Sequence, residues 1–152
     1  MALSQLGSLI YATGRSRLYS GEDEHQRSIY AQLNGQALKA TCRWLAQHEF
    51  PCSSDVLFVS GSQEKIALLA DYVMVTEQEA LLIDDVANSL CRAALRLPSE
   101  KQKALRRYMT LVVYGESDPI RVAAPPFRRI LTLSDWSQAS LLISQLEDAN
   151  VA

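Results

Sequence analysis

The sequence predicts an α+β fold: a predominantly helical single domain over residues 1–152 with a small antiparallel sheet, with an all-α fold as the alternative. Three observations lead to this expectation. Long stretches carry apolar residues at helical spacing, short β-branched runs stand between them, and 152 residues fit one domain. Hydrophobic residues make up 48% and charged residues 21%, which is typical of a folded globular protein.

The first third of the chain predicts two helices. Residues 2–14 place leucines and an isoleucine at helical spacing, and Gly14 would end that helix. The stretch "SIYAQLNGQALKATCRWL", residues 28–45, allows two interpretations. Its Asn34-Gly35 pair is a strong hairpin signal, whereas apolar residues at helical spacing continue past that pair. We favour one helix over residues 23–48, strained at Gly35.

The middle of the chain predicts strands followed by a helix. Residues 56–59 form an apolar run typical of a strand. Residues 65–75 are either two strands, around "KIALLA" and "YVMV", or a helix that begins near Ser62, and we favour the strands. Residues 76–97 give the clearest helical pattern, because Thr76 and Glu79 form a capping box before an apolar stripe. Asp84 and Asp85 would then be solvated residues on that helix.

The last third predicts a basic helix, a group of strands and a closing helix. Pro98 interrupts the chain, and residues 99–109, "SEKQKALRRYM", form the next helix. Residues 110–124 read as two strands around a Gly-Glu-Ser-Asp-Pro turn, and residues 125–133 add a third. Ser134 or Asp135 then caps a final helix over residues 136–148.

Charge is distributed unevenly along the chain, although the net charge is only −2. Residues 87–130 contain nine basic residues against three acidic ones, a local surplus of six positive charges. Such a segment has two interpretations, an ordinary solvated helix face or a surface that binds nucleic acid or an acidic partner. The candidate binding residues within this Arg92–Arg129 region are Arg96, Lys101, Lys103, Arg106, Arg107, Arg128 and Arg129.

The sequence contains no pattern that indicates catalysis. It lacks a nucleophile elbow, a phosphate-binding glycine loop and a paired-carboxylate signature. Cys42, His48 and Cys52 form its one cysteine–histidine cluster, but their spacing is wider than zinc ligands usually have, and a fourth ligand is missing. We therefore expect no catalytic residue, no metal site and no cofactor.

Cysteine usage and hydropathy predict the compartment. Three cysteines are an odd number at irregular spacing, which does not suit a disulfide framework. At the start of the sequence no basic region precedes an apolar region, as a secretion signal would require, and no apolar run approaches the length of a membrane span. The sequence thus predicts a cytoplasmic protein that does not enter the membrane.

The order of the elements, together with the closing segment "LTLSDWSQASLLISQL", residues 131–146, resembles the class I chaperones of type III secretion. The likeness covers the last two-thirds of the chain and rests on pattern alone. It implies a small, acidic, dimeric α+β protein without catalytic residues, and it assigns no functional residue here.

Several amphipathic helices in one small domain, without a catalytic constellation, predict a non-enzymatic adaptor or regulatory protein. It would act by protein–protein interaction, as a secretion-chaperone-like homodimer or with another protein, because spare apolar faces are rarely left exposed. The alternative is a nucleic-acid-binding transcriptional regulator that uses the basic Arg92–Arg129 region.

Overall fold

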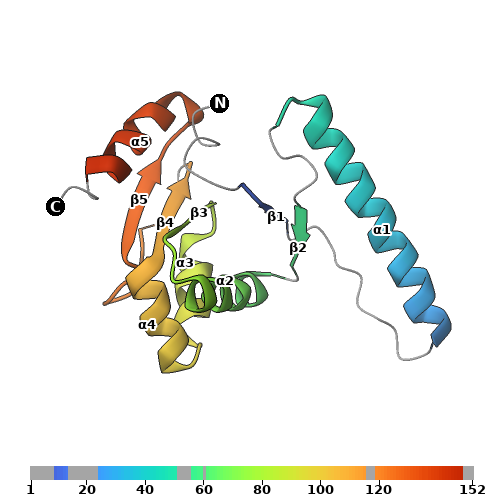
Figure 1. The fold of residues 1–152 in the computed structure, drawn as a ribbon, viewed down its shortest axis with the longest axis horizontal. Helices are drawn as coiled ribbons and strands as arrows, with labels where there is room; N and C mark the ends of the chain where they lie inside the picture. The colour runs from blue at the N-terminus through green and yellow to red at the C-terminus, as the bar shows by residue number, and fades with distance from the viewer. Residues whose placement is uncertain (1–8, 14–23, 51–55, 60, 116–118, 149–152) are drawn as a thin grey trace. The chain divides into compact units, whose positions relative to one another are not determined.

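The structure is a computed structural model of the chain, and it describes residues 9–13, 24–50, 56–59, 61–115 and 119–148 (Figure 1). The chain divides into two compact units, residues 3–61 and residues 62–152. Each unit contains its own strands and helices. The single domain over residues 1–152 stays a prediction.

The first unit consists of β1 (Tyr11–Thr13), α1 (Glu24–Gln47) and β2 (Val56–Phe58), and its two strands pair in parallel. α1 confirms the long helix, with Gly35 inside it rather than in a hairpin turn. The alanine, glutamine and leucine residues around Gly35 are strong helix formers, which outweighs the cost of one glycine, about 1 kcal/mol. Residues 11–13 form a strand and not the end of a first helix, whereas residues 1–8 and 14 lie outside the described residues.

The second unit alternates helices and strands along the chain. Its elements are α2 (Ser62–Thr76), β3 (Ala80–Asp84), α3 (Ala87–Leu95), α4 (Ser99–Tyr108), β4 (Met109–Tyr114), β5 (Arg129–Leu133) and α5 (Ala139–Asp148). A 3₁₀ turn at Trp136–Gln138 precedes α5, and the side chain of Asp135 caps it by accepting the Ser137 backbone N–H. The basic helix, β4, β5 and the closing helix therefore confirm the sequence prediction.

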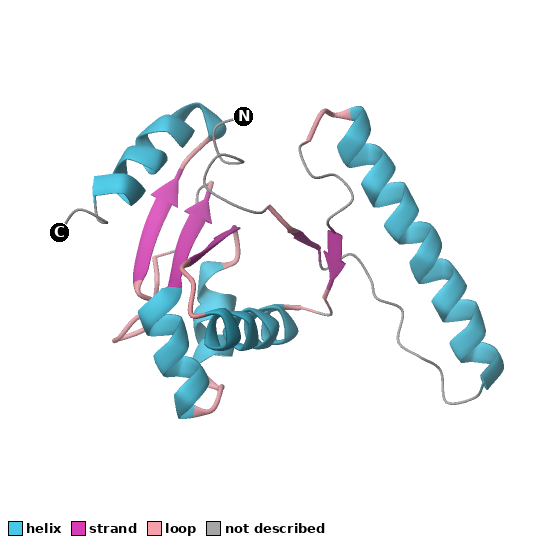
Figure 2. Ribbon diagram, viewed as in Figure 1, coloured by secondary structure: helices cyan, strands magenta, loops and turns pink. Residues whose placement is uncertain are grey.

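The sheet of the second unit is parallel, so the predicted antiparallel sheet is wrong. Its strand order is β3-β4-β5, and β4 pairs in parallel with both neighbours (Figure 2). The connections explain the direction: α3 and α4 join β3 to β4, and residues 115–128 join β4 to β5. Crossovers of this length return the chain to the same end of the sheet, whereas a hairpin needs only a short turn. The fold thus combines helices and strands, which excludes the all-α alternative.

Three other segments differ from the sequence prediction. Residues 62–76 form helix α2 rather than two strands, and Ile66, Ala70 and Val73 are its buried residues. Residues 76–97 are not one helix, because residues 80–84 form β3 and α3 begins only at Ala87. A short apolar run such as "ALLI" fits a buried strand and a buried helix equally well, and here pairing with β4 decides. Residues 119–124 contain no strand.

Helices cover both faces of this sheet. Leu111 and Val113 of β4 belong to the main apolar core, which also holds the buried residues of α2, α3 and α4. Val112 of β4 points the other way and packs with Leu133 of β5 and Leu142 of α5. Because neighbouring residues of a strand point to opposite faces, β4 is buried on both sides. The second unit therefore has three layers, with the sheet in the middle.

Cys91 is completely buried in the main core, and burial raises the pKa of its thiol. Since only the thiolate reacts with alkylating reagents, we expect Cys91 to resist modification in the folded protein. A variant with Cys42→Ser and Cys52→Ser, treated with iodoacetamide and followed by mass spectrometry, should stay unmodified until urea unfolds it. The matched variant that keeps only Cys42, which is half-buried, should react faster under native conditions. Equal native rates would contradict the burial of Cys91.

Candidate functional site

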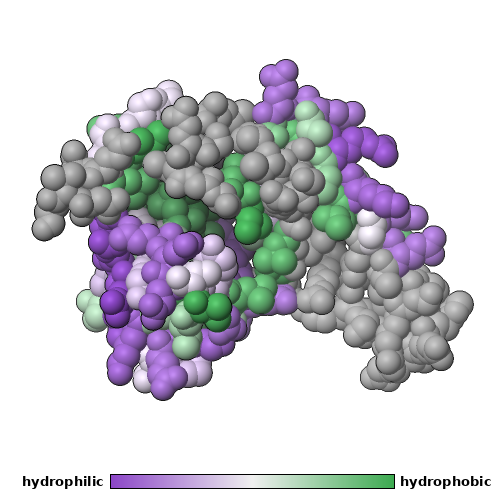
Figure 3. Space-filling view, in the orientation of Figure 1, coloured by the Kyte–Doolittle hydropathy of each residue, from purple (hydrophilic) through white to green (hydrophobic). Residues whose placement is uncertain are grey.

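The outward face of α4 carries three of the predicted basic residues. Ala104 and Leu105 face the core, and Lys103, Arg106 and Arg107 project from the opposite side, where all three are exposed. Residues three and four apart lie on one face of a helix, so these three cations are neighbours. The surface over α4 is largely hydrophilic (Figure 3).

A hydrogen-bonded glutamine connects this face to the end of α3. Gln102 Nε2 donates to the carbonyl oxygens of Leu95 and Leu97, at 3.0 and 2.8 Å, and thereby closes the carboxyl end of α3. Its Oε1 accepts a hydrogen bond of 3.1 Å from Arg106 Nη2. Arg96, an exposed residue, occupies the cap position of the same helix end. Arg96 and Arg106 are therefore held on one region of the surface.

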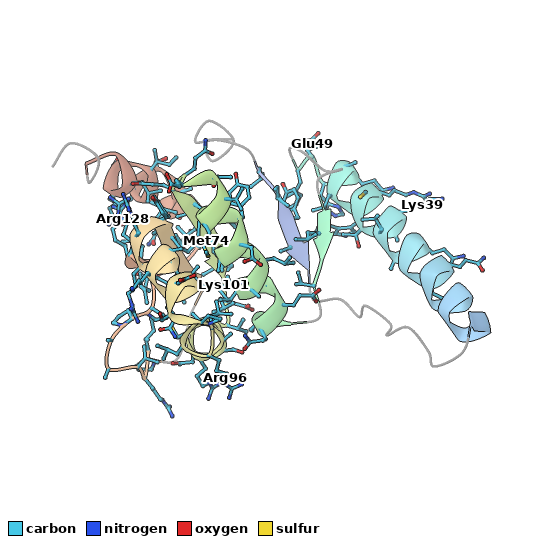
Figure 4. All side chains as sticks on the ribbon, turned by 60° about the horizontal axis from the view of Figure 1, so that its bottom comes forward. Lys39, Glu49, Met74, Arg96, Lys101 and Arg128 are labelled. Atoms are coloured by element: carbon cyan, nitrogen blue, oxygen red, sulfur yellow. The ribbon has the colours of Figure 1, made fainter. Side chains whose placement is uncertain are left out.

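The other predicted basic residues either form ion pairs or lie outside the outward face of α4. Lys101 Nζ forms an ion pair of 2.6 Å with Asp71 Oδ1 of α2, and Arg128 is paired with Glu79. Arg129 is half-buried at the start of β5, and its Nε is buried without a hydrogen-bond partner among the described residues. Arg128 and Arg96 lie well apart (Figure 4). The structure thus brings together only part of the predicted set.

We call the remaining group the α3–α4 basic surface. Arg92 joins it, because it is exposed on the last turn of α3, four residues before Arg96. Basic residues in the last turn of a helix also stabilise it by interacting with the helix dipole, which accounts for some of them structurally. The members of the surface are Arg92, Arg96, Lys103, Arg106 and Arg107.

α2 has a second apolar face in addition to the one in the core. Leu68, Tyr72 and Val75 lie opposite its buried residues and are 41%, 46% and 85% exposed. Their spacing of four and three residues makes them one stripe, which we call the α2 outer face. A helix that is apolar on both sides is normally buried on both sides. This stripe is therefore a candidate surface for contact with another protein chain.

An ion pair at the carboxyl end of β3 was not predicted from the sequence. Lys65 Nζ of α2 lies 2.5 Å from Asp84 Oδ2, and the two side chains are only 13% and 8% exposed. Asp84 Oδ1 also accepts the backbone N–H of Val86 at 3.1 Å, where the chain turns into α3. Asp84 is thus a nearly buried strand-end residue and not the solvated helical residue that the sequence indicated. Its position directly after an apolar run was the available signal.

Polar contacts continue along this end of the sheet. Ser89 of α3 donates a hydrogen bond of 2.9 Å to the hydroxyl of Ser62 on α2. Asn88 of α3 makes two hydrogen bonds to the segment that leads to β5. Its Nδ2 donates to the Pro119 carbonyl oxygen, and its Oδ1 accepts the Arg121 backbone N–H. These bonds satisfy polar groups within the fold and fix where α2 and α3 begin.

An aromatic pair lies where β4 and β5 end. The ring of Trp136, 51% exposed, stacks on Tyr114 with 5.0 Å between the ring centroids. Asp135 precedes it, and hydrogen bonds from the Ser137 hydroxyl and backbone N–H lower the pKa of its carboxyl group. Gly115 follows β4 with φ of +76°, a left-handed conformation that glycine adopts without strain.

In the part of the chain that the structure describes, no three His, Cys, Asp or Glu residues come together in a group that could hold a metal ion. His48 instead stacks on Trp44 at the end of α1, with 4.1 Å between the ring centroids. Cys42 lies on α1 and is half-buried, and Cys52 lies outside the described residues.

Comparisons with protein-family models, with curated proteins and with solved structures found no match for this chain. Among the described residues, no helix has both the length and the apolar composition needed to cross a membrane.

Proposed function

We propose that the chain is a non-enzymatic adaptor or regulatory protein that acts by binding protein, and that it forms a homodimer through the α2 outer face. The observation that carries this proposal is the exposure of Leu68, Tyr72 and Val75 on a helix whose opposite side is already in the core. Covering this stripe removes apolar side chains from water, which is the main favourable term in protein association.

The stripe suits a second copy of the same chain. A two-fold interface brings the same surface patch of both subunits together, so the patch has to complement itself. Leu68 and Val75 lie at equal distances from the middle of the stripe, and Tyr72 lies beside that middle. In an antiparallel pair of α2 helices, Leu68 of each copy faces Val75 of the other. Asp71 at the margin is neutralised within its own subunit by Lys101, so two copies bring no unpaired carboxylates together there.

Thiol chemistry supports a reducing compartment such as the cytoplasm for this protein. Cys42 and Cys91 are free thiols, and Cys91 is buried in the core of the second unit. Free cysteines persist where glutathione and thioredoxin keep thiols reduced. The homodimer is also the state that the resemblance to secretion chaperones implies.

The proposal predicts that Val75→Glu shifts the protein from dimer to monomer. Val75 is 85% exposed in the single chain, so glutamate there should not disturb folding, whereas a dimer would have to bury its charge. We expect the dissociation constant, measured by sedimentation velocity over a concentration series, to rise at least about tenfold, equivalent to about 1.4 kcal/mol.

The matched control is Leu141→Glu, a change at another exposed apolar residue, on α5, which should leave the dimer intact. A wild-type protein that stays monomeric throughout the micromolar range would overturn the homodimer. So would a Val75→Glu variant that associates as tightly as the wild type.

A further inference from the structure

A second surface of the same unit carries a different chemistry. Within the described residues, Arg92, Arg96 and Lys103 make no ion pair, in contrast to Lys101 and Arg128, whose charges are compensated by Asp71 and Glu79. Arg106 binds only the neutral amide of Gln102, and the guanidinium of Arg107 lies 5.1 Å from the centre of the Tyr108 ring. All five cations of the α3–α4 basic surface are therefore exposed, and no acidic side chain within the described ranges pairs with them.

The surroundings of these cations are polar on α4, whereas α3 adds one exposed apolar side chain, Leu95, which is 40% exposed. The exposed residues of α4 are Ser99, Glu100, Lys103, Arg106 and Arg107, so its outward face holds one acid and no apolar side chain. α3 contains no acidic residue at all. A ligand on this surface thus meets positive charge and hydrogen-bond donors but no apolar side chain of α4 to anchor it.

We propose that the α3–α4 basic surface binds the phosphate backbone of nucleic acid without reading its sequence. Four of the five cations are arginines, whose planar guanidinium groups donate two parallel hydrogen bonds to a phosphate. Contacts from arginine and lysine to phosphates position a duplex and carry no sequence information. An acidic peptide fits less well, because peptide recognition normally adds contacts to specific side chains, and the exposed residues of α4 include no apolar one.

The strength of this binding should depend steeply on salt. Each phosphate contact releases condensed counterions, so the logarithm of the binding constant falls with the logarithm of the salt concentration by about 0.9 per contact. If all five cations engage, the slope is about −4.5, and affinity drops roughly 500-fold between about 50 and 200 mM salt. Removing two contacts should reduce the slope by about two.

The test is fluorescence anisotropy with a fluorescein-labelled DNA duplex of mixed sequence, titrated with the full chain across this salt range. We expect Arg106→Glu with Arg107→Glu to weaken binding at least about tenfold and to flatten the salt slope. The matched control is Lys39→Glu with Arg43→Glu, two exposed residues of α1 that give the same change in net charge. The control should retain most of the wild-type affinity, because it changes the net charge equally but leaves all five cations of the α3–α4 basic surface in place.

Four outcomes would overturn the proposal: no binding at the lowest salt, binding that does not respond to salt, equal losses in both double variants, or tighter binding to polyglutamate or to anionic lipid vesicles than to DNA. The result is independent of the homodimer. Val75→Glu reports on the α2 outer face alone, so failure of either proposal leaves the other open to its own test.

Discussion

Replacing Lys65 by alanine should lower the free energy of unfolding of the second unit by about 3–5 kcal/mol. Lys65 and Asp84 form an ion pair of 2.5 Å in which both side chains are largely excluded from water. Removing the ammonium leaves the Asp84 carboxylate nearly buried without a counter-charge, and an unpaired buried charge is far more costly than an exposed one. Asp84 also holds the turn between β3 and α3 by accepting the Val86 N–H, so the damage reaches the start of α3.

Urea denaturation followed by circular dichroism measures this effect. The matched control is Lys103→Ala, an exposed lysine without an ion pair among the described residues, which should change the free energy of unfolding by less than about 0.5 kcal/mol. The double variant Lys65→Met with Asp84→Leu should recover most of the loss, because apolar residues of similar volume replace buried ion pairs well. A Lys65→Ala variant as stable as the Lys103→Ala control would contradict the burial of this pair.

Three of the helices could be predicted from the sequence. α1, α4 and α5 have apolar residues at helical spacing, and Asp135 and Pro98 mark where the last two helical segments begin. β3 could not be separated from the helix that follows it, because an apolar run of four residues suits either structure when buried. Its pairing with β4, which lies far along the chain, decides the outcome.

The sequence of β4 contains a signal for the parallel direction of the sheet. Residues 109–113, "MTLVV", are all buried, and their apolar character is nearly continuous rather than alternating. Such runs are typical of central parallel strands, whereas antiparallel strands with one solvated face alternate apolar and polar residues. The pattern of β4 therefore indicates a strand that is covered by helices on both faces.

The sequence shows which segment carries the positive charges, but it does not show which of these charges are paired with acidic residues. Asp71 neutralises Lys101, and Glu79 neutralises Arg128, although the members of each pair are distant in the sequence. Only the packing of α2 beside α4 and of β5 near the start of β3 brings them together. The α2 outer face was not predicted for a different reason: residues 65–75 were assigned to two strands rather than to a helix.

The burial of β4 on both faces leads to a second large effect. Leu111→Ala should lower the free energy of unfolding by about 2–5 kcal/mol, since Leu111 is completely buried between the sheet and helices α2, α3 and α4. Val112→Asp, on the face toward α5, should prevent stable folding, because it places a carboxylate where no described side chain provides a counter-charge. Thermal and urea unfolding of the two variants report on the two faces separately.

Leu141 of α5 provides the control for both changes, because it is 60% exposed. Leu141→Ala and Leu141→Asp should each stay within about 1 kcal/mol of the wild type, which isolates burial as the cause. A stable Val112→Asp variant would mean that water reaches the second face of the sheet and that α5 does not cover β4. The three-layer arrangement requires both β4 variants to be destabilised, since a parallel strand in the middle of a sheet has no solvated side on which a charge is tolerated.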